Sequence, residues 1–213
     1  SMQKFDWYAA STAGHNTLTF GGRGQNACTD DFPAVLPSGW FDGEASPVET
    51  SAIECRARID TFSGPGKWAI VNLSTSYTLS GATAAQRGVA IASATTGPHD
   101  DGVVFLDEFV LSSTVSNVTW SLHTTANVSV KRSASRAVLA SGNESIILQA
   151  VPGAGCGGLA VAAVAGDSGR WAPTGRTWAG HTVVMVTLLH PTAQCTQLQI
   201  NMWPVGAGPP PLR

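Results

Sequence analysis

Gly14-His15-Asn16-Thr17-Leu18-Thr19-Phe20-Gly21-Gly22 is the stretch of sequence from which the fold can be worked out. Its centre, residues 17–20, alternates polar and apolar side chains, and this alternation predicts a half-buried β-strand. The flanking glycines are turn residues, so the strand is short and bounded on both sides. His15 therefore enters a strand from a small-residue loop, where its backbone is fixed and its imidazole is able to face a cleft. The alternative is that His15 only bonds a loop carbonyl.

Similar strand patterns recur along the rest of the chain, about ten residues apart. The other expected strands are 52–62, 68–73, 87–92, 102–111, 115–123, 126–131, 137–140, 146–151, 158–164, 182–189 and 196–203. We expect a hairpin around Thr124-Thr125, a short helix at 80–86, and Ile59 on the apolar face of its strand. Many strands without crossover helices predict an all-β fold, a two-layer antiparallel β-sandwich of roughly a dozen strands.

The composition is that of a folded, turn-rich chain with enough residues for one sizeable core. Of its 213 residues 43% are hydrophobic and 12% are charged, and it has 23 glycines and 12 prolines. We expect one β-sandwich domain at 8–204, a cloning remnant and linker at 1–7, and a Pro/Gly-rich tail at 205–213. A net charge of −2 leaves no basic stripe for phosphates, which excludes nucleic acid as a partner. No apolar run reaches the ~18 residues of a membrane span.

Cysteines and glycosylation sequons indicate the secretory route. The even set of Cys28, Cys55, Cys156 and Cys195 contains no CxxC pair of the kind that holds zinc. Proximity in sequence favours Cys28–Cys55 and Cys156–Cys195 among the three pairings, and four buried free thiols are the alternative. Sequons occur at Asn72, Asn117, Asn127 and Asn143. Together these features predict a secreted, extracellular glycoprotein with disulfide bonds.

Two short motifs are expected to be turns rather than sites. Gly166-Asp-Ser-Gly169 matches the surroundings of the nucleophile in trypsin-like serine proteases, but His99 and His123 lack the sequence context of that family's base. The glycine-rich run 153–158 fits a GxGxxG pattern without a βαβ unit around it. We interpret this run as a glycine turn between strands, held by Cys156.

A set of motifs in a fixed order gives the sequence a family resemblance. They are His15-Asn16-Thr17, a strand at 68–73 followed by Tyr77, a strand led by Arg87, an apolar strand ending in Asp107-Glu108, and Trp120-Ser-Leu-His123. In order and spacing they resemble the β-sandwich domain of the heparinase II/III-like polysaccharide lyases and their alginate-lyase and epimerase relatives. The resemblance covers residues 8–200.

The resemblance implies an enzyme that cleaves a uronic-acid polysaccharide, such as a glycosaminoglycan or alginate, by β-elimination. In that family most of the proton-transfer groups lie on an N-terminal α/α-toroid, and the sandwich closes the cleft and lends it a histidine. We therefore expect His15 to be catalytic and this chain alone to be inactive. Asn16, Arg23, Trp40 and His123 are the expected contacts to the acidic polysaccharide. The toroid is the second expected partner.

Some members of the family hold zinc in the sandwich with two histidines and an aspartate. His15, Asp107 and His123 have suitable chemistry for that metal. However, Asn72 stands where relatives carry an acidic residue before the tyrosine. We therefore expect no cofactor, with zinc or calcium as the alternative.

A different class of function also fits the sequence. The chain would then be a secreted carbohydrate-binding or adhesion β-sandwich with no catalytic role. Sugar-binding modules present aromatic side chains on loops or flat surfaces, and Trp7, Trp40, Trp171 and Trp178 lie in loop-like contexts. A toroid encoded upstream of this sequence would decide in favour of the lyase.

Overall fold

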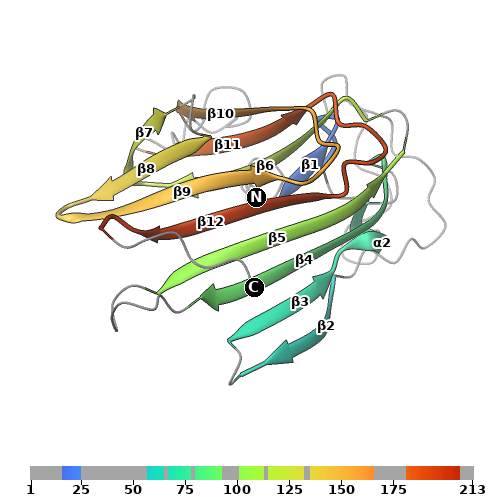
Figure 1. The fold of residues 1–213 in the computed structure, drawn as a ribbon, viewed down its shortest axis with the longest axis horizontal. Coiled ribbons are helices and arrows are strands. Elements are labelled where there is room, and N and C mark those ends of the chain that lie inside the picture. The colour runs from blue at the N-terminus through green and yellow to red at the C-terminus, as the bar shows by residue number, and fades with distance from the viewer. Residues whose placement is uncertain are drawn as a thin grey trace, which may run out of the picture.

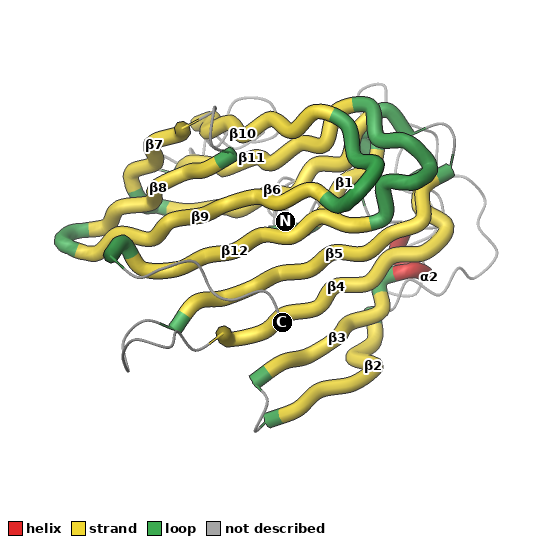
Figure 2. The backbone as a smooth tube through the Cα atoms, in the orientation of Figure 1, coloured by secondary structure: helices red, strands yellow, loops and turns green. Residues whose placement is uncertain are grey.

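The computed structural model describes residues 16–24, 57–64, 67–77, 80–92, 101–112, 115–131, 135–165 and 181–206. Within these residues the chain forms twelve β-strands in two antiparallel sheets, which are stacked as two layers (Figure 1). Most of the described backbone is strand, and the short helix α2 (Ser74–Tyr77) lies beside one end of the large sheet (Figure 2). The predicted all-β antiparallel sandwich is confirmed.

The large sheet has eight strands and the small sheet has four. The order in the large sheet is β2 (Arg58–Ser63), β3 (Trp68–Asn72), β4 (Ala82–Ala92), β5 (Gly102–Leu111), β12 (Gln197–Pro204), β9 (Glu144–Pro152), β8 (Arg136–Ser141) and β7 (Asn127–Lys131). The order in the small sheet is β1 (Leu18–Phe20), β6 (Asn117–Thr124), β11 (Thr182–Leu189) and β10 (Gly158–Ala165).

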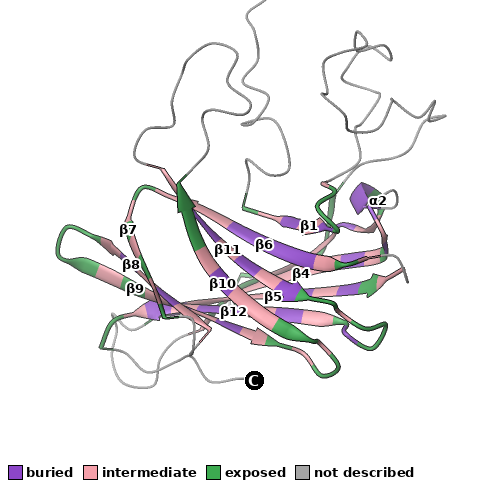
Figure 3. Ribbon diagram, turned by 90° about the horizontal axis from the view of Figure 1, so that it is seen from above, coloured by how far each residue is buried: buried purple, intermediate pink, exposed green. Residues whose placement is uncertain are grey.

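The core lies between the two layers and is built from the inward-facing side of each strand. Leu18 and Trp120 are cross-strand partners in the small sheet, and both are almost completely buried. Aromatic contacts join the layers, because Phe20 meets Phe109 at 5.8 Å and Trp120 meets Phe105 at 5.9 Å between ring centroids. Figure 3 shows buried segments in β1, β6 and β11. Each fully buried large side chain contributes roughly 1.5–3 kcal/mol.

The expected helix at 80–86 is wrong. Residues Ala82–Ala92 form the long strand β4, which pairs with β5 over its whole length. The alanines at 82, 84 and 85 are good helix formers, but cross-strand pairing and burial override that preference. The one-turn helix lies earlier, at Ser74–Tyr77, where Asn72 Oδ1 accepts a hydrogen bond from the amide of Ser74.

The expected hairpin around Thr124-Thr125 is also wrong. The strands β6 and β7 belong to different sheets, so the chain passes from the small layer to the large one at this point. Thr124 Oγ1 accepts a hydrogen bond from the amide of Ala126 and stabilises the crossing. Both strands carry alternating side chains, and alternation does not tell which strand is the partner.

Ile59 does not lie in the core. It faces the inner side of the large sheet opposite Val71, but it is 63% exposed, and Phe62 on the same strand is 74% exposed. The reason is layer coverage: β2 is an edge strand, and β2 and β3 project beyond the small sheet (Figure 1). A β-bulge between Ile59 and Thr61 and the exposed pair Arg58–Asp60 are features by which proteins protect a free sheet edge.

A disulfide joins Cys156 to Cys195, as expected from their proximity in sequence. It links the turn between β9 and β10 to the turn between β11 and β12. The turn also needs glycine at 157, because an added Cβ there would lie 2.5 Å from the carbonyl oxygen of Leu189. Cys28 and Cys55 lie outside the described residues. In the described part of the chain, no helix is long and apolar enough to cross a membrane.

Candidate functional site

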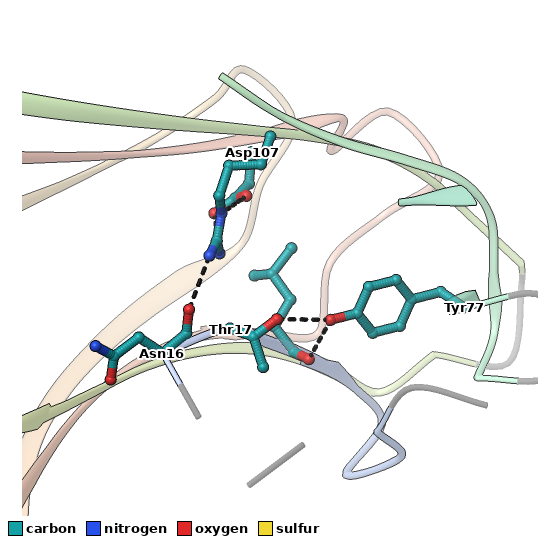
Figure 4. Close-up of polar contacts among 6 residues, drawn as sticks. Asn16, Thr17, Tyr77 and Asp107 are labelled. Atoms are coloured by element: carbon teal, nitrogen blue, oxygen red, sulfur yellow. Dashed lines mark hydrogen bonds and ion pairs between the residues drawn. The ribbon is translucent and has the colours of Figure 1, made fainter. Parts of the chain in front are cut away.

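The first residues of β1 lie at a corner where both sheets contribute polar side chains. The sequence motifs at 15–17, 87, 107 and 120–123 come from four segments that are far apart along the chain. Antiparallel pairing places β6 beside β1, while β4 and β5 lie in the opposite layer. Figure 4 shows the polar contacts that converge on Asn16 and Thr17. We call residues 16–18, with the side chains that bond them, the β1 corner.

Arg87 and Asp107 form a bidentate ion pair inside the sandwich. They are direct cross-strand partners on β4 and β5. Arg87 donates from Nε to Oδ1 at 2.6 Å and from Nη2 to Oδ2 at 3.0 Å. The Asp107 side chain is completely buried, and that of Arg87 is 13% exposed. The planar guanidinium matches the carboxylate fork, so the pair has a defined orientation.

The remaining guanidinium nitrogen of Arg87 reaches the small sheet. Its Nη1 donates to the main-chain carbonyl oxygen of Asn16 at 2.9 Å. One side chain thus connects the buried carboxylate of Asp107 to the backbone at the start of β1 (Figure 4). Burial raises the pKa of the Asp107 carboxyl, and the neighbouring Arg87 charge offsets part of that rise.

Tyr77 is a second anchor of the β1 corner. Its hydroxyl donates to the carbonyl oxygen of Leu18 at 2.9 Å and lies 2.8 Å from Thr17 Oγ1. The ring is completely buried and stands edge-on to Phe20, with 5.0 Å between centroids. The hydroxyl is therefore occupied in holding β1 and is not positioned as a proton-transfer group.

Asn16 and His123, two of the expected substrate contacts, are brought together. The amide of His123 donates to Asn16 Oδ1 at 2.8 Å, and the amide of Ser121 donates to the carbonyl oxygen of Thr17 at 3.0 Å. Asn16 is exposed and His123 is half-buried. A polar, partly exposed surface of this kind is able to bond sugar hydroxyls.

The other expected site residues are placed differently. Arg23 is exposed and forms a bridge with Phe20 through two main-chain hydrogen bonds, so it lies at the end of β1 opposite Asn16. His15 and Trp40 lie outside the described residues. Their roles therefore stay predictions.

The zinc set considered from sequence, His15 with Asp107 and His123, does not fit the geometry. The Asp107 carboxylate faces the core and is already bonded by Arg87. On β6, Trp120 packs inward, so His123, an odd number of residues further on, faces the outer side. Among the described residues no group of three or more His, Cys, Asp or Glu side chains is arranged to hold a metal.

The four sequons differ in their surroundings. Asn127 and Asn143 are exposed, whereas Asn72 and Asn117 are half-buried. Asn72 bonds the start of α2 through Oδ1, and Asn117 Nδ2 donates to Ser116 Oγ at 3.3 Å. Glycosylation at all four stays a prediction.

The sequence motifs include Arg87 and Asp107, but they do not indicate the contact of Arg87 with Asn16. One signal was present: Asp107 is a carboxylate at an inward-facing position of the apolar strand Gly102–Leu111. A charge placed there needs a partner from the opposite face or a neighbouring strand. The bond to Asn16 O depends on how the two layers stack, which strand patterns do not encode.

No protein-family model matches this chain, and no curated protein matches it. A solved structure described as a heparinase III gene product is similar in fold, with a TM-score of 0.52 and 11% sequence identity. The match covers 91% of this chain but 24% of the solved one, so this chain spans about a quarter of that protein's length. At this identity the likeness is one of fold.

Proposed function

We propose that residues 8–204 are the β-sandwich domain of a heparinase II/III-like polysaccharide lyase that acts on a uronic-acid polysaccharide by β-elimination. The main observation that supports the proposal is that the sequence motifs lie next to one another in the structure. Asn16-Thr17, Arg87, Asp107 and His123 were singled out as one family pattern, and they adjoin at the β1 corner through the bonds described above. The fold likeness to a heparinase III gene product, over 91% of this chain, supports the same proposal.

In this proposal His15 supplies one catalytic contact next to the β1 corner. Elimination needs a base at C5, an acid at the leaving oxygen, and neutralisation of the uronate carboxylate. Tyr77 and Asp107 are already committed to other bonds, so they do not supply the missing groups. We therefore assign those groups to an N-terminal α/α-toroid in a longer, secreted parent protein. Asn16 and His123 bind the sugar, and Arg23 and Trp40 add contacts.

The experiment has a binding arm and an activity arm. Short uronate oligosaccharides added to ¹⁵N-labelled protein should shift the amide resonances of Asn16 and His123, and a neutral oligosaccharide should not. Residues 1–213 should release no unsaturated uronate, followed by ultraviolet absorbance, from heparan sulfate, chondroitin sulfate or alginate. In the longer protein His15→Ala should lower turnover by about 10²–10⁴-fold. Uronates that leave Asn16 and His123 unshifted would refute the proposal.

A carbohydrate-binding or adhesion module is the second candidate, and one observation favours it. Phe62 is 74% exposed on the edge strand β2. Exposed aromatic rings are the usual contacts of sugar-binding surfaces. In that case Phe62→Ala would abolish oligosaccharide binding, and resonance shifts would appear on β2 and β3 instead of at the β1 corner.

A further inference from the structure

We propose that Arg87 and Asp107 are positioning residues, which fix the direction of the main chain at Asn16 from the opposite sheet. The catalytic meaning of this role rests on the proposed function, because His15 directly precedes Asn16. The claim that Arg87 and Asp107 fix the main chain at Asn16 does not depend on that function, because it concerns only hydrogen bonds among the described residues.

The main-chain ladder of β1 gives way to side-chain bonds at Asn16. The amide of Ser121 bonds the carbonyl oxygen of Thr17, as in a regular antiparallel pair. Two residues further on, the amide of His123 bonds Asn16 Oδ1, which is a side-chain atom. The chain therefore leaves the sheet at Asn16, and pairing with β6 no longer determines its direction there.

Arg87 supplies the constraint that the ladder no longer gives. Its Nη1 holds the carbonyl oxygen of Asn16 at 2.9 Å, while its other nitrogens are fixed by Asp107. The carboxylate cannot move easily, since it is completely buried on β5. The peptide plane that follows Asn16 is thus tied to the large sheet through two side chains.

Stability alone is a poor reason for this ion pair. Burying two charges carries a desolvation penalty, and well-packed apolar residues in the same place are often as stable or more stable. A rigid fork that binds a carboxylate and a carbonyl at once gives directional control that apolar packing lacks. The geometry therefore fits a positioning role better than a stabilising one.

Arg87→Lys separates the two roles. One ammonium group keeps the charge beside Asp107 but cannot occupy all three positions held by the guanidinium. Arg136→Lys is the matched control, because Arg136 is also half-buried in the large sheet, where it donates to Gln149 and lies over Trp203. Among the described residues its contacts are with β9 and β12, away from the β1 corner. A double variant, Arg87→Met with Asp107→Leu, removes both charges at similar volume.

The measurement is native-state amide hydrogen exchange of residues 1–213. In Arg87→Lys and in the double variant, the amides of His123 and Ser121 should exchange about tenfold faster relative to that of Ile200 in β12. Arg136→Lys should leave this ratio unchanged. An unchanged ratio in Arg87→Lys, or the same acceleration throughout the protein, would overturn the positioning role.

A second measurement tests whether the Arg87–Asp107 pair affects binding of a uronate at the β1 corner. The dissociation constant for a uronate oligosaccharide, followed at the Asn16 amide, should rise in Arg87→Lys and stay constant in Arg136→Lys. If the wild-type protein binds no uronate, the proposed function fails, while the exchange ratio still decides whether Arg87 positions Asn16. If binding is equal in Arg87→Lys and wild type, the catalytic meaning of the pair is refuted.

Discussion

The β1 corner and the β2–β3 edge differ in which side chains they bury. At the corner, charged and hydroxyl groups are buried, and Arg87, Asp107 and Tyr77 bond one another or the backbone of β1. At the edge, Ile59 and Phe62 point to the inner side of the sheet but remain exposed. The difference shows that layer coverage decides burial, while strand pattern decides only which side a residue faces. Polar groups are kept inside where they hold the chain in a particular direction.

Removing one charge at the β1 corner should have the largest effect on stability. Asp107→Leu leaves the Arg87 cation inside the sandwich without its counter-ion. We expect the free energy of unfolding to fall by about 3–5 kcal/mol, the cost typical of breaking a buried pair. Urea unfolding followed by circular dichroism measures this change.

The double variant Arg87→Met with Asp107→Leu should recover most of that loss, because no uncompensated charge remains. Glu108→Gln is the control on the neighbouring outer-facing position, where Glu108 bonds Gln86. It should change stability far less than Asp107→Leu does. Equal losses at 107 and 108 would contradict the distinction between buried and outer-facing carboxylates.

Tyr77→Phe tests the second anchor with a smaller expected effect. The ring and its packing against Phe20 are kept, and only the hydroxyl that bonds Leu18 O and Thr17 Oγ1 is lost. A buried acceptor left without its donor costs about 1–3 kcal/mol. Urea unfolding should report a loss in this range, with faster exchange of the Ser121 amide. A neutral substitution would mean that the hydroxyl is not needed to hold β1.

Much of the fold followed from sequence patterns. The strand at Gly102–Leu111 was predicted with its observed bounds, because a short run rich in Val and Phe and bounded by turn residues favours a strand over a helix. The strand at Thr182–Leu189 was predicted equally well. The helix expected at 80–86 failed, since local propensity there loses to pairing with β5. The Thr124-Thr125 hairpin failed because alternation carries no information about the partner strand.

The candidate site was less predictable than the fold. Asn16 and His123 were named together from motif order, and the bond between them agrees with that grouping. The bond from Arg87 to Asn16 O was not foreseen, because it depends on how one layer lies over the other. Ile59 illustrates the same limit at the edge: its side of the strand follows from alternation, but its exposure follows from the extent of the opposite sheet.

The pH dependence of stability should reflect the titration of the buried Asp107 carboxyl group. Burial raises the pKa of Asp107 above that of the unfolded chain, so the folded protein binds this proton more tightly. This contribution to stability is therefore present below the unfolded pKa of about 3.9 and is lost as pH rises from there through the folded value. Arg87 offsets part of the shift, which keeps the effect smaller than that of Asp107→Leu.

The measurement is the difference in unfolding free energy between the wild type and the charge-free double variant, from pH 3.5 upward. We expect this difference to move against the wild type as pH rises. Because the wild type and the double variant share all other carboxyl groups, the effects of those groups cancel in the difference. A difference that moves in favour of the wild type over this range would show that the attraction of Arg87 outweighs burial.

The smallest effect is expected at the β2 edge. Phe62→Ala removes a ring that is 74% exposed and lies beyond the small sheet, so little packing is lost. We expect a change within about 0.5 kcal/mol, as for surface positions in general. Phe109→Ala is the matched control in the same sheet, because Phe109 is 2% exposed and contacts Phe20. It should cost about 3–5 kcal/mol by leaving a cavity. Urea unfolding measures the loss of unfolding free energy in both variants. If Phe62→Ala costs as much as Phe109→Ala, the edge is covered in solution and the contrast between edge and corner does not hold.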